Sequence, residues 1–182
     1  MRLQSLGLAT SFITVVTLLA CKETTSSSLD TDNQSAAPST LAFTKLPPGC
    51  KNVHGKVELT TIPSPNDPFG RSIGPSTGAL KGAVSSVLTS FTPLVGAWGA
   101  TSEDVLVAGP TDIIVSSSTT TYTPIPGGPI GAMSVETTQS IISGTGKYYG
   151  ATGTIVVTGT AFNMFASGGP WFDLEYEGTV CT

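Results

Sequence analysis

Few residues of this chain have the types and spacing that a reactive centre needs. His54 is the only histidine, so a histidine-rich metal site is excluded. It lies on the polar side of an alternating segment, and we interpret it as a solvated residue. A serine triad through His54 would also lack any nucleophile-elbow motif.

Three acidic residues near the C-terminus have a spacing that could serve chemistry. Asp173, Glu175 and Glu177 alternate with the apolar residues of segment 172–176, so in a strand they share one face. Adjacent members would be about 7 Å apart, within the range of a glycosidase carboxylate pair. Because the opposite face would be the buried one, we interpret this set as a solvated acidic face. A calcium site and a glycosidase pair are the alternatives.

The segment from Ser143 to Gly153, SGTGKYYGATG, is the most distinctive motif. It is not a P-loop, because that motif needs glycine where Ile141 stands and serine or threonine where Tyr148 stands. The dinucleotide-binding pattern also fails, since its third glycine comes one residue late. The segment instead predicts a hairpin whose glycines adopt conformations closed to other residues. These structural glycines are Gly144, Gly146, Gly150 and Gly153. We expect a positive φ at Gly146 or Gly150, or at both.

The first 20 residues predict a secretory signal peptide. Arg2 is the only charge before an apolar run from Leu6 to Ala20, and this run is shorter than the roughly 20 residues of a membrane span. It ends Leu18-Leu19-Ala20-Cys21, which resembles the lipobox of bacterial lipoproteins. The resemblance implies cleavage after Ala20, diacylation of the Cys21 thiol and acylation of the new amino group. An ordinary signal peptide with a cysteine at its cleavage site is the alternative.

Lipidation of Cys21 would tether the protein to the cell envelope, because two or more acyl chains hold a protein on a membrane stably. Lys22 follows the cysteine, and aspartate there is the inner-membrane retention signal of lipoproteins. We therefore expect an extracytoplasmic lipoprotein of the outer membrane. With Cys21 acylated, Cys50 and Cys181 are the remaining cysteines, too few for a structural zinc site. We expect no metal and no cofactor.

Residues 21–45 predict a disordered tether. Serine, threonine and other small polar residues dominate from Lys22 to Thr40, so the segment has too little apolar surface to offset the entropy of ordering it. We expect a spacer between the lipid and the folded domain. A segment that binds cell-wall polymer is the alternative.

Residues 46–182 predict one all-β domain. Only 11% of the chain is charged, while it contains 21 glycines and 13 prolines. Low charge with abundant serine and threonine is typical of strands and turns. The net charge is −4 and no basic cluster occurs, which argues against nucleic acid as a partner.

Alternating polarity and turn residues divide this domain into strands. The segment 53–61 alternates throughout, and the proline-rich segment Ile62 to Gly70 reads as a loop. The expected strands cover residues 53–61, 80–91, 104–108, 112–123, 130–142, 151–162 and 172–181. Turns are expected at Thr92-Pro93, among other places. Seven or eight strands suit an antiparallel barrel or a sandwich.

The glycine motif resembles a hairpin of the allene oxide cyclase and dirigent protein superfamily, especially of its bacterial barrel-like relatives. These proteins carry Gly-Thr-Gly-(Lys/Arg)-(Tyr/Phe)-x-Gly-Ala-x-Gly before a late strand, and residues 144–153 match it. Weaker similarity covers residues 70–74, 78–82 and 176–180. The resemblance implies an eight-stranded antiparallel barrel with an apolar cavity, often assembled as a homo-oligomer. Plant members steer the cyclisation or coupling of reactive small molecules.

The resemblance also implies candidate site residues. Glu58 corresponds to an acidic first-strand residue of the cyclases and is the candidate catalytic residue. Phe91, Trp98 and Tyr148 are candidates for lining a ligand, because an eight-stranded barrel can hold one small molecule. Packing in the core or at a barrel end is the alternative role for these aromatic side chains.

The barrel also predicts a disulfide between Cys50 and Cys181. In a closed barrel the first and last strands pair, and these cysteines stand at the start of the first strand and the end of the last. The extracytoplasmic compartment is oxidising in many bacteria. Two separate buried thiols are the alternative.

Three functions fit this sequence. The first is a tethered barrel that binds a small apolar molecule or a protein partner. The second is a cyclase-type or dirigent-type enzyme, which acids or hydroxyls converging in a cavity would favour. The third is a structural envelope protein with a filled barrel.

Overall fold

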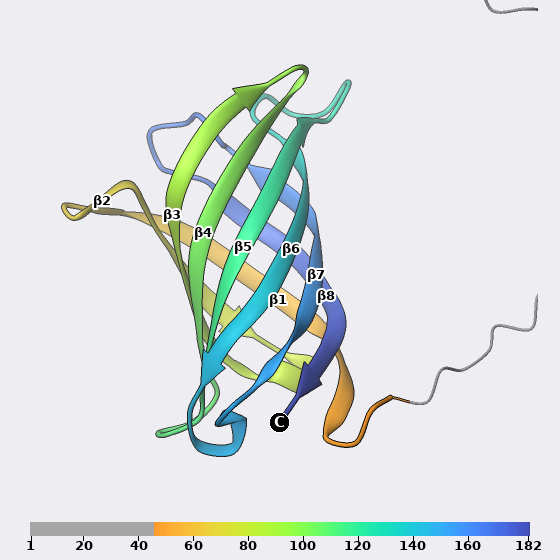
Figure 1. Cartoon of the computed structure of the whole chain (residues 1–182). Helices are drawn as coiled ribbons and strands as arrows, with labels where there is room; N and C mark the ends of the chain where they lie inside the picture. The colour runs from red at the N-terminus through yellow and green to blue at the C-terminus, as the bar shows by residue number, and fades with distance from the viewer. Residues whose placement is uncertain (1–45) are drawn as a thin grey trace, which may run out of the picture. The chain divides into compact units, whose positions relative to one another are not determined.

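The computed structural model describes residues 46–182, which form a closed barrel of eight antiparallel strands (Figure 1). The strands are β1 (Cys50–Ser64), β2 (Asp67–Ser76), β3 (Gly82–Leu94), β4 (Ala97–Val107), β5 (Ile113–Pro124), β6 (Met133–Gly144), β7 (Thr152–Phe162) and β8 (Trp171–Cys181). Two 3₁₀ turns, η1 (Gly78–Leu80) and η2 (Gly146–Tyr148), complete the fold. The expected fold class, all-β with an eight-stranded antiparallel barrel, is confirmed.

The predicted signal peptide (1–20), lipid site (Cys21) and tether (21–45) lie outside the described residues and stay predictions. Over residues 46–182, no helix is long and apolar enough to cross a membrane.

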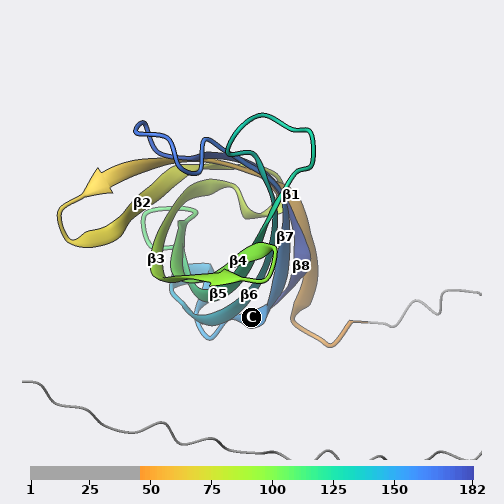
Figure 2. The same cartoon turned by 90° about the horizontal axis from the view of Figure 1, so that it is seen from above.

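The expectation of a loop from Ile62 to Gly70 was wrong. β1 continues to Ser64, the chain turns over two residues, and β2 starts at Asp67. This hairpin extends past the neighbouring strands (Figure 2), since β8 pairs with β1 only up to Thr60 and β3 pairs with β2 only from Arg71. A proline here therefore removes no hydrogen bond to a second neighbour.

The expected turn at Thr92-Pro93 was wrong for the same reason, and the expected strand 104–108 covers only the last part of β4. β3 passes through Pro93 and turns at Val95 and Gly96, and β4 already begins at Ala97. Beyond Val87, β3 pairs only with β4, so Pro93 lies where a missing donor is tolerated.

The two ends of the barrel differ. One, the closed end, holds both ends of the described chain, η1, η2 and the β4–β5 connection (Figure 1). The other, the mouth, is formed by the β1–β2, β3–β4, β5–β6 and β7–β8 connections. At the closed end Cys50 and Cys181 are paired in the β1–β8 register and joined by the predicted disulfide.

The glycine motif forms a plug for the closed end. Gly146 and Gly150 have φ of 60° and 71°, which confirms the expected positive φ. Between them η2 directs Tyr148 into the core, where only 9% of its surface is exposed. A side chain at Gly146 would also meet Asp112, because an added Cβ would lie 2.2 Å from its Oδ1 atom.

The second 3₁₀ turn repeats this arrangement. Thr77 precedes Gly78, the first residue of η1, as Thr145 precedes Gly146, the first residue of η2, and a Gly-Ala pair follows shortly after each turn. Gly78 has a φ of 81°, and Leu80 is buried in the core as Tyr148 is. Because β2 and β6 run in the same direction, the two plugs lie at the same end of the barrel.

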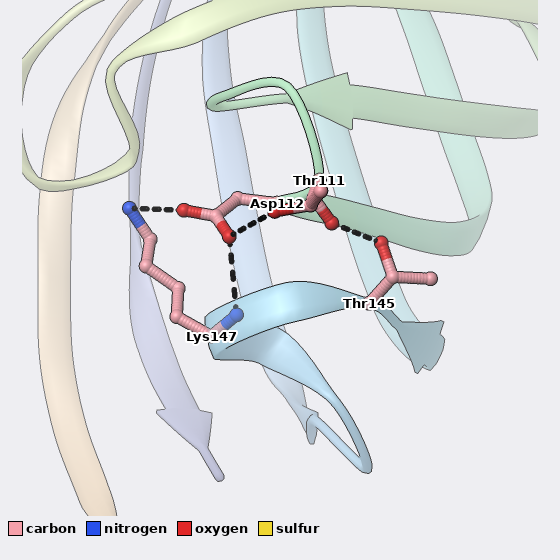
Figure 3. Close-up of polar contacts among 4 residues, drawn as sticks. All are labelled: Thr111, Asp112, Thr145 and Lys147. Atoms are coloured by element: carbon pink, nitrogen blue, oxygen red, sulfur yellow. Dashed lines mark hydrogen bonds and ion pairs between the residues drawn. The ribbon is translucent and has the colours of Figure 1, made fainter.

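Polar contacts fasten η2 to the β4–β5 connection (Figure 3). Asp112 accepts a hydrogen bond from the Lys147 backbone N–H at 3.1 Å, and its carboxylate lies 3.3 Å from Lys147 Nζ. Thr145 Oγ1 donates to the Thr111 carbonyl at 2.5 Å. The backbone hydrogen bond from Lys147 holds the pKa of the Asp112 carboxyl below its usual value.

Candidate functional site

The barrel encloses a cavity lined by side chains from all eight strands. About 120 Å³ of it is open to the centre of a water molecule, which is far more than one buried water needs. At the closed end the lining reaches Leu80 of η1, and toward the mouth it includes Phe69, Met164 and Pro170. The interior is therefore not completely filled by its own side chains.

Two unlike walls face each other across this cavity. The apolar wall comes from the adjacent strands β7, β8 and β1, and the polar wall comes from β3 to β6 on the opposite side of the ring. The apolar wall consists of Val57, Leu59, Ile155, Val157, Phe172 and Leu174. The polar wall includes Ser86, Ser102, Asp104, Ser116, Thr120, Thr137 and Gln139. The side formed by β3 to β6 is mixed, because Val84, Leu88, Leu106, Ile114 and Val135 of the same strands also line the cavity.

Asp104 is the centre of the polar wall, with only 5% of its surface exposed. Its Oδ1 atom accepts a hydrogen bond from Ser102 Oγ at 3.2 Å. Its Oδ2 atom accepts one from Gln139 Nε2 at 3.2 Å and another from the Ser118 hydroxyl. Three donors on three strands therefore fix the carboxyl group.

Strand register brings these groups together. Ser102 stands opposite Ser118 in the β4–β5 pair, and Ser118 stands opposite Gln139 in the β5–β6 pair. Asp104 is two residues from Ser102 on the same inward face. Cross-strand neighbours on one face are close enough for side chains to interact, so the network follows directly from the register.

Among residues 46–182, Asp104 is the only acidic or basic one that lines the cavity. Over residues 46–182, the ion pairs join Lys56 to Glu175, Arg71 to Asp67 and Lys147 to Asp112, all outside it. No lysine, arginine or histidine of the described chain contributes to the lining. A buried carboxylate without an opposite charge is costly, which makes Asp104 the chemically unusual group of this interior.

Tyr122 lies on the inward face of β5 with Ser118 and Thr120. Burial and, to a smaller extent, the nearby Asp104 raise the pKa of its hydroxyl to about 12. At neutral pH Tyr122 is therefore a neutral hydroxyl at the edge of the polar wall.

The predicted lining residues occupy opposite ends of the barrel. Phe91 and Trp98 stack with their ring centroids 5.0 Å apart, and Phe91 also contacts Phe69 and Tyr122, which line the cavity. These two side chains therefore lie at the mouth, next to lining residues, and are not part of the cavity lining themselves. Tyr148 packs in the core at the closed end, so the structure does not bring the three together.

Glu58 lies on the outer face of β1, exposed, opposite Asp173 of β8. It is not among the residues that line the cavity. His54 is exposed on the same face, as we interpreted it.

The acidic residues of β8 also lie on the outer face. Asp173, Glu175 and Glu177 are all exposed, and Glu175 pairs with Lys56 at 3.1 Å, which fits the solvated acidic face. In the described part of the chain, no three His, Cys, Asp or Glu residues are placed to hold a metal ion.

Asp104 was not predicted as a site residue. The only sequence signal is polar residues at alternate positions. These are Ser102 and Asp104 in β4, and Ser116, Ser118 and Thr120 in β5. That run is interleaved with other hydroxyl residues, since 116–121 consists only of serine and threonine. Polarity alone therefore cannot tell which face of β5 points inward.

Comparison with models of known protein families, with curated proteins and with solved structures finds no match to this chain.

Proposed function

We propose that this protein binds a small amphipathic molecule inside its barrel, while the predicted lipid on Cys21 holds it at the cell envelope. The observation that carries the proposal is the cavity with two unlike walls. An apolar body would lie against Val57, Leu174 and their neighbours, and a polar group would face Asp104. Burial of apolar surface supplies affinity, while a few placed polar groups supply orientation.

The fold supports an outward-facing mouth for a tethered protein. The described chain begins at the closed end, beside the Cys50–Cys181 disulfide. A tether attached there leaves the mouth at the far end of the barrel, open to ligands that approach from the surroundings. This part of the proposal depends on the Cys21 anchor, and Cys21→Ser tests it directly. The variant should move from the membrane fraction to the soluble fraction, and retention on the membrane would contradict the anchor.

A cyclase-type or dirigent-type enzyme is the second candidate. The observation that favours it is the convergence of Asp104 with several hydroxyl groups inside the cavity. Such groups could hold or move a proton on a bound molecule. A structural protein with a filled barrel is the least supported of the three, because the interior keeps open space.

Cavity binding can be tested on the full chain carrying Cys21→Ser. Native mass spectrometry should detect a co-purifying small molecule, and 1-hexanol added to ligand-free protein should shift amide resonances of cavity residues. Val157→Phe fills the apolar wall and should abolish that shift. Val156→Phe adds the same ring to the outer face, where Val156 is 42% exposed, and should leave binding unchanged. Equal binding by both folded variants would contradict a site inside the barrel.

A further inference from the structure

We infer that the molecule bound in this barrel carries a positively charged amine, which pairs with Asp104. The inference rests on the proposed function, and it adds the chemical class of the ligand. It depends on the charge balance and the free hydrogen-bonding capacity of the polar wall.

The first support is charge complementarity. Asp104 is buried, and the described chain brings no lysine, arginine or histidine to the cavity. Hydrogen bonds from Ser118 and Gln139 disperse the charge of the carboxylate but do not neutralise it. A ligand cation supplies the missing opposite charge, in surroundings where a charge pair is much stronger than in water.

The second support is the uneven use of the two carboxylate oxygens. Oδ2 accepts from both Ser118 and Gln139, whereas Oδ1 accepts only from Ser102. A carboxylate oxygen can accept about two hydrogen bonds, so Oδ1 retains capacity for one more donor. An ammonium group carries three N–H donors and no acceptor. One would serve Oδ1, and the hydroxyl of Ser116, which lines the cavity and stands opposite Asp104 in the β4–β5 pair, could accept another.

The third support comes from the rest of the lining. Tyr122 presents an aromatic ring at the edge of the polar wall, and an organic cation is attracted to such a ring. The apolar wall opposite Asp104 disfavours a bare metal ion, because calcium takes six to eight oxygen ligands around it. The same wall suits the hydrocarbon part of an amine. The space of about 120 Å³ that is open to the centre of a water molecule suits a short hydrocarbon chain.

The experiment compares three probes with the same hydrocarbon chain and different charge. n-Hexylamine is a cation at neutral pH, 1-hexanol is neutral and hexanoate is an anion. Each is titrated into the full chain carrying Cys21→Ser, with affinity measured by calorimetry or by amide shifts. We expect hexylamine to bind at least tenfold more tightly than hexanol, and hexanoate to bind most weakly.

A pair of neighbouring variants locates the charge that is responsible. Asp104→Asn removes the inward carboxylate and should weaken hexylamine binding at least tenfold, and hexanol binding much less. Glu103→Gln removes the same charge from the exposed outer face of the same strand, and should change neither affinity. If Asp104→Asn fails to fold, the ranking of the three probes on the unsubstituted barrel still decides.

The outcomes separate the inference from the proposed function. Hexanol that binds as tightly as hexylamine would overturn the amine and keep the cavity as a binding site. Hexylamine binding that is unaffected by folded Asp104→Asn would also overturn it. A failure of all three probes to bind would overturn both proposals together.

Discussion

Gln139 on β6 donates a hydrogen bond to Asp104 on β4 at 3.2 Å, across the intervening strand β5. This contact joins two strands that have no backbone hydrogen bonds with each other. We predict that Gln139→Leu lowers the free energy of unfolding by about 1 to 3 kcal/mol, because it leaves a buried acceptor with one donor fewer. Urea denaturation measures the loss. Ser140→Ala, an exposed change on the next residue, should have little effect, and an equal loss in both variants would contradict the role of the bridge.

Tyr176 ties η1 to the barrel wall. Its hydroxyl accepts a hydrogen bond from the Leu80 N–H and donates one to the Thr77 carbonyl, both at 2.7 Å. Tyr176→Phe should destabilise the fold by about 1 to 3 kcal/mol, since the Leu80 N–H loses its partner in a buried position. Tyr149→Phe removes a hydroxyl from a side chain that is 84% exposed and is the matched control. Thermal melts that rank the two variants equally would contradict this prediction.

Gly146 and Gly150 separate two effects of adding a methyl group. Both have positive φ, but an added Cβ at Gly146 would collide with Asp112 and Thr111, whereas at Gly150 it would meet nothing within 4 Å. Gly150→Ala should therefore cost about 1 kcal/mol from its backbone conformation alone. Gly146→Ala should cost clearly more, as measured by chemical denaturation. A Gly150→Ala variant that is the less stable of the two would be inconsistent with these contacts.

The contact of Asp112 with Lys147 predicts a dependence of stability on pH. The pKa of Asp112 is lowered from 3.8 in the folded protein, chiefly by the Lys147 backbone N–H. Its ionised form is therefore favoured by folding, so the contribution is present above about pH 4 and is lost as the pH falls through the lowered pKa. The melting temperature of Asp112→Asn should lie below that of the unsubstituted chain at neutral pH, and the gap should narrow in acid. A gap that does not change with pH would contradict the assignment.

Cys50 and Cys181 close the barrel covalently. Removing the bond with Cys50→Ala and Cys181→Ala together should lower the free energy of unfolding by at most roughly 4 to 5 kcal/mol, because the cross-link restricts a long loop in the unfolded chain. The 131-residue separation of the two cysteines makes this loop nearly the whole domain. Denaturation with and without reductant gives the comparison. A chain that is equally stable when reduced would show that strand pairing alone closes the barrel.

Much of the fold could be predicted from this sequence, and the reasons are local. Alternation identified β1 and β8, because one face of each is buried and the other is exposed. The motif around Gly146 identified a strained turn, because glycine is the residue that tolerates positive φ. The proline-containing parts of β1, β2 and β3 were missed, since the sequence does not reveal where a strand has only one neighbour.

The candidate site could not be predicted in the same way. Asp104 becomes significant only when β5 and β6 bring Ser118 and Gln139 beside it, and that register depends on the closed ring. Glu58 was chosen for its place in the first strand, but its side chain lies outside the barrel. Phe91 and Tyr148 are both aromatic and partly or fully buried, yet they lie at opposite ends.

The position of the disulfide also determines how the barrel responds to a mechanical pull. In a protein anchored as proposed, tension from the membrane would reach the domain at the first residue of β1. There the Cys50–Cys181 bond would pass part of the force directly to β8. The bond would therefore keep β1 from being peeled away from β8 starting at that end, one hydrogen bond after another. The disulfide therefore protects the pairing of β1 with β8 at the point where a tethered domain would be pulled.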